Sequence, residues 1–371
     1  MKPVILITGA NGCVGRAVVE HLLAERAPAD LILLLHRDGK KFPFEWRDLP
    51  VQMIEGDIAV PELGLSDGEA TLLRRQVNVV VHGAADTRLT ASYEMLERTN
   101  VTGTERVLTF ARGCRRLEKF VHLSTTCVAG KRTGVIPEAP LSARTGFVNG
   151  YERTKWEAER RVLEAGLPAQ IVRLSTVVGS ERDGRIPRWG AAHLALYFLY
   201  RGLLAMVPGH PHSTLDFISS DLAAQVIAAA ALQPAGRVPV LHASAGQAAM
   251  PLNEFLDSAI ARFALVHNGW ARGALTRPPI VDELTFRLFR ESVALSRDLL
   301  FNQILACTQS FLPGLLYPKI CSTANAEALL GRRLPTPPWR QLAGQVIDHC
   351  LATNWKRPKE EKSVYACSDP I

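Results

Sequence analysis

The stretch LITGANGCVGRAVVEHLLAE, residues 6–25, decides the fold of this chain. Its three glycines, Gly9, Gly12 and Gly15, lie between an apolar run and an amphipathic one. A strand that turns through glycines into a helix leaves backbone N–H groups free at the helix N-terminus, where a phosphate can bind. The stretch therefore predicts a dinucleotide site, with an ordinary strand-to-helix turn as the alternative.

Short apolar runs alternate with amphipathic segments on either side of the glycines. Continuous apolar strands separated by helices are typical of a parallel sheet that is covered on both faces. The pattern predicts an α/β fold with a doubly wound parallel (Rossmann) sheet. The expected strands are 3–8, 31–36, 51–56, 77–84, 119–125, 170–175 and 238–244, and the expected helices include 14–26, 90–113 and 151–165.

The length of 371 residues leaves room for two lobes. The alternation loosens after about residue 176, and the chain beyond Pro251 looks mainly helical. We expect this smaller lobe to close over the carboxyl edge of the sheet, where ligands bind in open α/β folds. The predicted units are a Rossmann domain at 1–245, with part of the substrate lobe inserted around 180–218, a mainly helical substrate lobe at 246–354 and a flexible tail at 355–371.

The net charge of +7 is spread along the chain, so we expect no nucleic-acid partner. An anionic substrate or an acidic carrier protein suits this balance. The seven cysteines are widely spaced and include no CxxC pair, so no metal site is expected. Arg201 interrupts the longest apolar run and the chain starts in a strand pattern, so the sequence predicts a cytoplasmic protein.

The end of the second expected strand bears on the choice of cofactor. An acidic residue about 20 residues past the glycines would bind the ribose 2′-hydroxyl of NAD. Here Arg37 stands at that place, and Arg16 directly follows the last glycine. Two guanidinium groups near the ribose suit a 2′-phosphate and predict NADP(H). The alternative is that Asp38 takes the hydroxyl and that Arg16 is merely solvated.

Tyr151 and Lys155 are four residues apart in GYERTKWEAER and therefore lie on one face of a helix. A lysine ammonium beside a tyrosine stabilises its phenolate and lowers the phenol pKa toward neutrality. Upstream, HLSTTCVAG places Ser124, Thr125 and Thr126 at a strand end. A tyrosine and a hydroxyl residue that reach the same carbonyl oxygen would polarise it for hydride attack.

Five motifs in order resemble an extended short-chain dehydrogenase/reductase: the glycine triplet, HGAAD (82–86), Asn100, the hydroxyl-bearing strand end and the Tyr151/Lys155 pair. Within that superfamily, HLSTTCVAGKRTGVIPE, FVNGYERTKWEAE and LDFISSDLAAQVI look most like the thioester-reductase and fatty acyl-CoA reductase branch, with its male-sterility type NAD-binding domain. The resemblance implies NADPH-dependent reduction of an acyl thioester, carried by CoA or an acyl carrier protein, to an aldehyde and sometimes an alcohol.

The resemblance also implies a role for each matching residue. Tyr151 would donate the proton, Lys155 would bind the nicotinamide ribose, and Thr125 would share the substrate oxygen, with Ser124 as its rival. Asp57 and Ile58 would contact the adenine. The predicted catalytic residues are Thr125, Tyr151 and Lys155, and the predicted cofactor residues are Thr8, Gly9, Asn11, Gly12, Cys13, Val14, Gly15, Arg16, Arg37, Asp57, Ile58, Gly83, Ala84, Ala85, Asn100, Leu123, Tyr151 and Lys155.

Other functions remain open on the same residues. A 3β-hydroxysteroid dehydrogenase or a nucleotide-sugar epimerase or dehydratase would use the same tyrosine and lysine, and a non-catalytic NADP-sensing regulator would need neither. The apolar runs 193–206 and 299–318 could line an acyl channel, touch a membrane surface or form the core of the lobe. The chain is expected to be a monomer or a homodimer.

Overall fold

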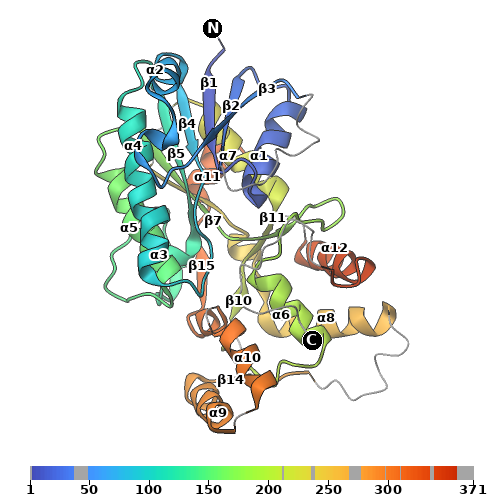
Figure 1. Cartoon of the computed structure of the whole chain (residues 1–371). Helices are drawn as coiled ribbons and strands as arrows, with labels where there is room; N and C mark the ends of the chain where they lie inside the picture. The colour runs from blue at the N-terminus through green and yellow to red at the C-terminus, as the bar shows by residue number, and fades with distance from the viewer. Residues whose placement is uncertain are drawn as a thin grey trace.

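Seven parallel strands form the sheet in the upper half of the molecule (Figure 1). Their order is β3-β2-β1-β4-β5-β7-β12, and every neighbouring pair is parallel. The direction of winding reverses between β1 and β4, the place where ligands bind in such sheets. The strands are β1 Val4–Thr8, β2 Asp30–His36, β3 Val51–Gly56, β4 Val79–His82, β5 Lys119–Thr125, β7 Ala169–Leu174 and β12 Val240–Ala243. The predicted doubly wound sheet is confirmed.

The computed structural model describes residues 2–36, 49–210, 213–234, 239–266, 277–296, 298–309, 311–334 and 338–356. In this part of the chain, helices cover both faces of the sheet, and the apolar strand residues are buried between them. Continuous apolar strands fold in this way because neither of their faces can remain in water. One face carries α1 Cys13–Ala24, α7 Ser220–Leu232 and α11 Ala324–Leu330, and the other carries α2 Asp67–Gln76, α4 Gly103–Arg112 and α5 Gly150–Leu163.

The helix expected over 90–113 is broken into α3 Tyr93–Glu97, a wider π-type turn at Arg98–Thr102, and α4. The turn contains Asn100, which is 1% exposed. Its side chain binds the backbone of Asp86 and the hydroxyl of Thr154. The irregular turn therefore ties the loop after β4 to helix α5, and π-type turns of this kind are frequent at functional sites.

A mainly helical lobe lies below the sheet (Figure 1). Its core is apolar and includes a cluster of aromatic rings, with Trp189, Tyr197, Phe263 and Trp355 among them. The helices of the lobe are α6 Ala191–Tyr200, α8 Leu252–Val266, α9 Glu283–Ser296, α10 Leu299–Thr308 and α12 Trp339–Ala352. Short strand pairs join its loops: β8 Thr176–Gly179 with β11 Phe217–Ser219, β9 Val207–Pro208 with β14 Ile280–Val281, and β10 Thr214–Leu215 with β13 Met250–Pro251.

The chain leaves this lobe after α10 and returns to the sheet. Strand β15 (Lys319–Cys321) pairs with β6 (Gly134–Ile136), and α11 packs against β12 and α7. Residues 319–334 therefore lie with the Rossmann part, although the predicted bounds assign them to the substrate lobe. The amphipathic pattern of a short helix does not reveal which body it packs against, so the sequence held no signal for this return.

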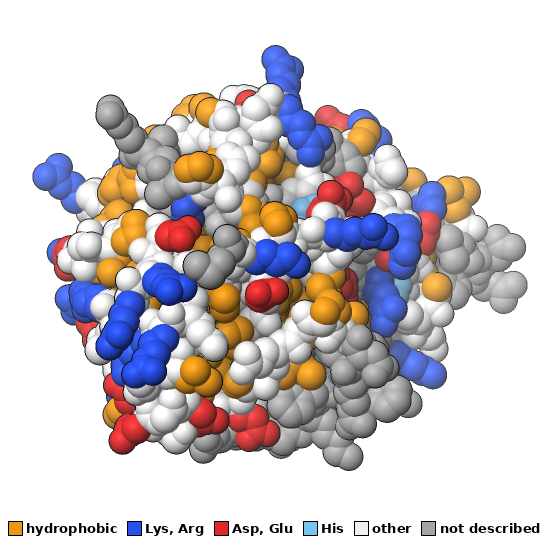
Figure 2. All heavy atoms as spheres, turned by 90° about the horizontal axis from the view of Figure 1, so that it is seen from above, with side chains coloured by type: hydrophobic (Ala, Val, Ile, Leu, Met, Phe, Trp, Pro, Cys, Tyr) orange, Lys and Arg blue, Asp and Glu red, His pale blue; other side chains and the backbone are white. Residues whose placement is uncertain are grey.

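Charged side chains are spread over the outer face of the sheet end. In Figure 2, Lys and Arg side chains are distributed across the face, with Asp and Glu between them. In the described part of the chain, each helix is too short or too polar to cross a membrane.

Candidate active site

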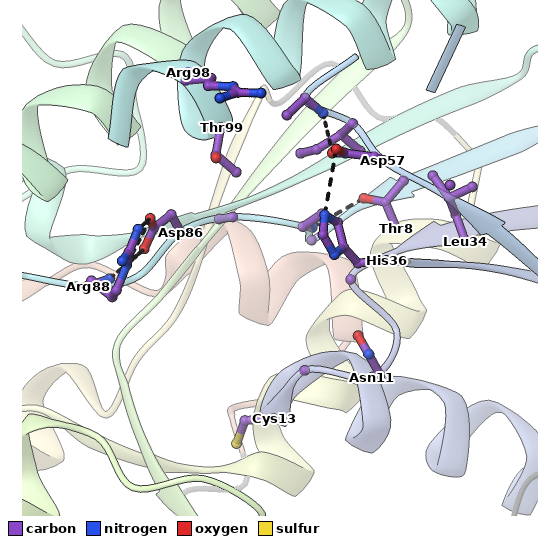
Figure 3. Close-up of a pocket in the computed structure, with 18 of the residues that line it drawn as sticks. Thr8, Asn11, Cys13, Leu34, His36, Asp57, Asp86, Arg88, Arg98 and Thr99 are labelled. Carbon is purple, nitrogen blue, oxygen red and sulfur yellow. Dashed lines mark hydrogen bonds and ion pairs between the residues drawn. The ribbon is translucent and has the colours of Figure 1, made fainter. Parts of the chain in front are cut away.

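A cavity of about 580 Å³ opens at the carboxyl ends of β1 to β4 (Figure 3). Strand ends from both sides of the winding reversal meet here, as the topology requires. The predicted cofactor residues that line it are Thr8, Gly9, Asn11, Gly12, Cys13, Asp57, Ile58, Gly83, Ala84 and Ala85.

The glycine loop forms the lower wall of this cavity in Figure 3. Gly9 has φ +73°, and a Cβ placed on it would lie 2.6 Å from the backbone nitrogen of Ala84. Gly12 is the extended N-cap of α1, and no side chain caps its first turn. The free N–H groups of that turn and the helix dipole make this end of α1 an anion site.

The remaining predicted cofactor residues that the structure describes lie outside the cavity lining. Gly15 packs against the glycine loop, since a Cβ there would be 2.2 Å from the carbonyl oxygen of Gly9. The Arg16 Nε donates a hydrogen bond to the Asn11 carbonyl at 3.3 Å. Arg37, the other residue that predicts NADP(H), is outside the described residues, as is its rival Asp38. The other predicted residues that do not line the cavity are Val14, Asn100, Leu123, Tyr151 and Lys155.

Three arginines that were not predicted site residues also line the cavity: Arg88, Arg98 and Arg188. Arg88 is held by Asp86, with Nε 3.0 Å from each carboxylate oxygen, and Figure 3 shows the pair facing the open space. Asp86 is fixed in turn by Asn100. Since phosphate groups favour guanidinium partners, these side chains add to the anion site on α1.

Asp57, which is predicted to contact the adenine, lines another part of the cavity wall. Its carboxylate accepts a hydrogen bond from the Ala59 nitrogen at 2.7 Å and lies 3.6 Å from the His36 Nε2. Figure 3 shows His36 and Asp57 together on the side of the cavity opposite Arg88. The predicted adenine-contacting residue is therefore present at the cavity wall, close to the ends of β2 and β3.

Lys155 lies under β5, on the inward side of α5. Its ammonium donates to the Leu123 carbonyl at 2.8 Å and lies 3.3 Å from the His122 Nε2. Burial lowers the pKa of Lys155 to about 8. Burial and the nearby Lys155 hold the pKa of His122 well below its usual range, so this histidine is neutral beside the ammonium.

Tyr151 stands in the first turn of α5, which Asn149 caps by accepting a hydrogen bond from the Glu152 nitrogen at 2.9 Å. Burial raises the pKa of Tyr151 above its ordinary value and neighbouring Cys127 adds to the rise, while a hydrogen bond with Thr125 opposes it. The sequence predicted that Lys155 lowers this pKa. In the structure, burial of the phenol instead sets the direction of the shift, and the Lys155 ammonium is bound at β5.

Two hydroxyl residues end strand β5, and only one is placed beside Tyr151. Thr125 is the partner that opposes the rise of the tyrosine pKa, and its Oγ1 accepts from the Cys127 nitrogen at 3.1 Å. Adjacent residues of a strand point to opposite faces. Ser124 is 4% exposed, and its hydroxyl makes no hydrogen bond among the described residues. The arrangement favours Thr125 over Ser124.

Tyr151 lines a second cavity, of about 260 Å³, between the sheet and the helical lobe. Its walls are mostly apolar and come from α6, α8 and the segments 213–217 and 311–321. Cys127 also lines it, and burial raises the pKa of that thiol, which leaves it a protonated and unreactive group. The apolar wall residues include Leu89, Ala192, Ala195, Leu199, Leu204, Leu252, Phe255, Leu256, Phe311, Leu312 and Leu315.

Three charged residues line this second cavity, and none of them was a predicted site residue: Glu152, Asp216 and Lys319. Glu152 follows the predicted tyrosine directly, so the motif itself held the signal. Lys319 is in LLYPKICSTANAEALLG, far from any predicted site residue. Only the pairing of β15 with β6 brings it to the cavity.

A family model described as male sterility protein matches residues 7–227, more than half of the chain. Among curated proteins, a polyketide synthase-nonribosomal peptide synthetase of Aspergillus clavatus is 28% identical over 236 residues, or 61% of this chain. A hybrid PKS-NRPS synthetase of Penicillium oxalicum is 31% identical over 256 residues, or 65% of this chain. The chain spans 6% of the length of each of these relatives.

Solved structures share the whole fold. The terminal R domain from the myxalamid PKS-NRPS biosynthetic pathway has a TM-score of 0.76 at 22% identity, covering 96% of this chain and 93% of that one. A thiolation-reductase di-domain from an archaeal non-ribosomal peptide synthetase has a TM-score of 0.70 at 18% identity, covering 96% and 76%. UDP-glucuronic acid 4-epimerase from Bacillus cereus, in complex with NAD, reaches 0.65 at 18% identity, covering 95% and 100%.

Proposed function

Since this chain belongs to the male sterility protein family of NAD-binding, extended short-chain dehydrogenase/reductases, we propose that it reduces acyl thioesters to aldehydes with NADPH. The acyl chain would be carried by CoA or by a carrier protein. The synthetase relatives and the R-domain and thiolation-reductase structures support a carrier-bound substrate. Further reduction to the alcohol would need a second NADPH.

One observation carries the proposal: Tyr151 lines a mostly apolar cavity, separate from the polar cofactor cavity. Arg88 lines the first cavity and its neighbour Leu89 lines the second, so this loop borders both spaces. An acyl chain suits the leucine and phenylalanine walls. A nucleotide sugar would instead need polar and basic partners for its diphosphate.

The residues at the first cavity fit a nicotinamide dinucleotide. The glycine loop leaves space that a Cβ would fill, and α1 presents its free N-terminus there. Arg16, beside this turn, and Arg37, 22 residues past Gly15, favour the 2′-phosphate of NADPH, and the arginines across the cavity add positive charge. Asp57 would contact the adenine, and Lys155 would hold the nicotinamide ribose.

NADPH, when bound, supplies the hydride. The Tyr151 hydroxyl donates its proton to the thioester carbonyl oxygen, and the raised pKa keeps that proton on the phenol at neutral pH. The Thr125 hydroxyl donates to the same oxygen while its Oγ1 accepts from the Cys127 nitrogen. The apolar cavity walls exclude water from the reacting carbonyl, which strengthens both hydrogen bonds. Loss of the thiol from the resulting hemithioacetal gives the aldehyde.

A substrate panel tests the function. The purified protein is mixed with NADPH and octanoyl-CoA or an octanoyl-carrier protein, with a 3β-hydroxysteroid and NADP, and with a UDP-sugar and NAD. Loss of NADPH absorbance together with octanal or octanol in the thioester reactions supports the proposal. Turnover of the steroid or the sugar alone would overturn it in favour of the corresponding enzyme class.

A charge-swapped variant tests the cofactor. Arg16→Ala combined with Arg37→Asp removes both proposed phosphate partners and places a carboxylate where NAD needs one. We expect the kcat/KM ratio of NADPH to NADH to fall by about tenfold or more, since a charge-assisted hydrogen bond contributes roughly 1.5–3 kcal/mol. An unchanged ratio would remove the argument for NADPH and leave the reductase proposal intact.

A further inference from the structure

We propose that Glu152 and Lys319 form a polar floor in the acyl cavity and select thioesters with a hydrogen-bonding group, a hydroxyl or an amide, close to the reacting carbonyl. The inference rests on the proposed thioester reduction and adds the substrate class. It starts from two of the three charged side chains that line a mostly apolar cavity, neither of which the mechanism uses. The third, Asp216, has both carboxylate oxygens engaged by Ser244 and Ala245.

Glu152 places one end of this floor beside the reacting carbonyl, because it directly follows Tyr151 and both residues line the cavity. One carboxylate oxygen accepts from the Val148 nitrogen at 2.8 Å. The other makes no hydrogen bond among the described residues and is not sealed from the cavity. Burial raises the pKa of Glu152 to about 7, while Lys319 and Lys131 oppose the rise. The carboxyl group is thus able to accept from a ligand.

Lys319 reaches the same floor from the opposite side. It begins β15, whose pairing with β6 fixes its backbone at the cavity. Its ammonium donates to the Gly130 carbonyl at 2.5 Å. An ammonium has three N–H donors, so further donors are available to a ligand. Its charge acts on both Glu152 and Cys127, which places it among the groups around Tyr151.

The polar wall residues nearest in character are engaged elsewhere: the Asp216 carboxylate accepts from Ser244 and Ala245, and Asn149 caps α5. Much of the remaining wall consists of leucine, phenylalanine and alanine side chains. A plain alkyl chain would cover the carboxylate and the ammonium without offering them a partner, which is unfavourable for buried charged groups. A hydroxyl or a secondary amide both donates and accepts hydrogen bonds. Such a group can donate to Glu152 and accept from Lys319 at once, so the cavity favours an acyl chain that carries one.

The test compares three CoA thioesters of similar length: octanoyl, 3-hydroxyoctanoyl and N-hexanoylglycyl. For the wild-type protein we expect kcat/KM to be about 10- to 100-fold higher for at least one polar thioester than for octanoyl, because sites built around buried polar groups discriminate strongly. A preference for the hydroxyl or for the amide supports the inference and identifies the group.

Two variants make the result specific. Lys319→Met and Glu152→Gln should each bring the ratio of polar to octanoyl kcat/KM toward one. Lys319→Arg, which keeps the positive charge, should retain part of the wild-type preference for the polar thioester. Lys356→Met is the matched control, because Lys356 is an exposed lysine that lines neither cavity. It should leave the ratio unchanged.

Three outcomes would overturn the inference: equal kcat/KM for all three thioesters in the wild type, equal losses on all three in both variants, or the same change in Lys356→Met. Absence of reduction with every thioester would instead refute the proposed function. If Lys319→Met does not fold, the Glu152→Gln ratio decides.

Discussion

The two cavities of this protein differ in how they are built. The cofactor cavity is made by strand ends and the turns that follow them, within the first hundred residues apart from Pro187 and Arg188. The acyl cavity collects side chains from Leu89 to Cys321. Its walls are mostly apolar, whereas the cofactor cavity carries three arginines and an anion-binding helix end.

The difference fits the chemistry of the two proposed ligands, a dinucleotide and an acyl chain. A pyrophosphate is the same in every dinucleotide, and a glycine turn before a helix binds it through backbone groups. An acyl chain is bound by surface burial, so many sets of apolar side chains can serve. The first cavity therefore has a local sequence motif, and the second has none.

The largest effect is expected in the wall of the acyl cavity, in Tyr151→Phe. Removal of the hydroxyl leaves the carbonyl oxygen without its proton donor, and kcat should fall by about 10²- to 10⁴-fold. NADPH binding, measured by fluorescence titration, should not change. Tyr93→Phe is the control, because the Tyr93 hydroxyl binds Glu157 at 2.7 Å and lines neither cavity. Full activity in Tyr151→Phe would contradict the assignment.

A substitution at Gly15, which packs against the glycine loop, should weaken cofactor binding and lower stability without altering the acyl cavity. In Gly15→Ala the new Cβ would lie 2.2 Å from the Gly9 carbonyl oxygen, so the loop must move. We expect the free energy of unfolding to fall by about 1–3 kcal/mol and NADPH to bind more weakly. Urea unfolding with and without NADPH measures both effects. Gly68→Ala, in α2 with no atom within 4 Å of the new Cβ, is the control and should unfold no more readily.

The pH dependence distinguishes the lysine from the tyrosine. Because the pKa of Lys155 is lowered to about 8, its ammonium is present below pH 8 and is lost above it. We expect kcat/KM to fall by about tenfold per pH unit above that value. Lys155→Arg keeps the positive charge and should give a lower but flat profile between pH 8 and pH 10. The same descending limb in Lys155→Arg would assign it to another group.

The smallest effect is expected in the wall of the acyl cavity. Ala195→Phe fills part of the space next to α6, and each methylene group that it excludes should raise the KM by about fourfold, from ~0.8 kcal/mol per buried methylene. Butanoyl and dodecanoyl thioesters compared by kcat/KM reveal the effect, which should appear only with the longer chain. Ala294→Phe, on the exposed side of α9, is the control. Equal losses on both chains would place the acyl group elsewhere.

The membrane contact, the oligomeric state, the tail and the roles of the remaining site residues stay predictions. The exposed Leu284, Leu288 and Leu295 of α9 fit either contact with a surface or solvation. Among the cofactor residues, those on strand ends lie at the cavity, while Asn100 lies behind it and fixes Asp86. The family resemblance implied that Asn100 supports the site, and the structure adds Asp86 as the partner that it holds.

The sequence by itself determined the seven strands, their parallel arrangement, the glycine turn and the helix that carries Tyr151 and Lys155, because each depends on local periodicity and turn chemistry. Only the tertiary structure decided that Lys155 is bound to Leu123, that Arg88 faces the cofactor cavity and that Lys319 returns to the acyl cavity. These placements come from strand pairing and packing between distant segments. The raised pKa of Tyr151 also follows from them, since burial of the phenol outweighs its hydrogen bond with Thr125.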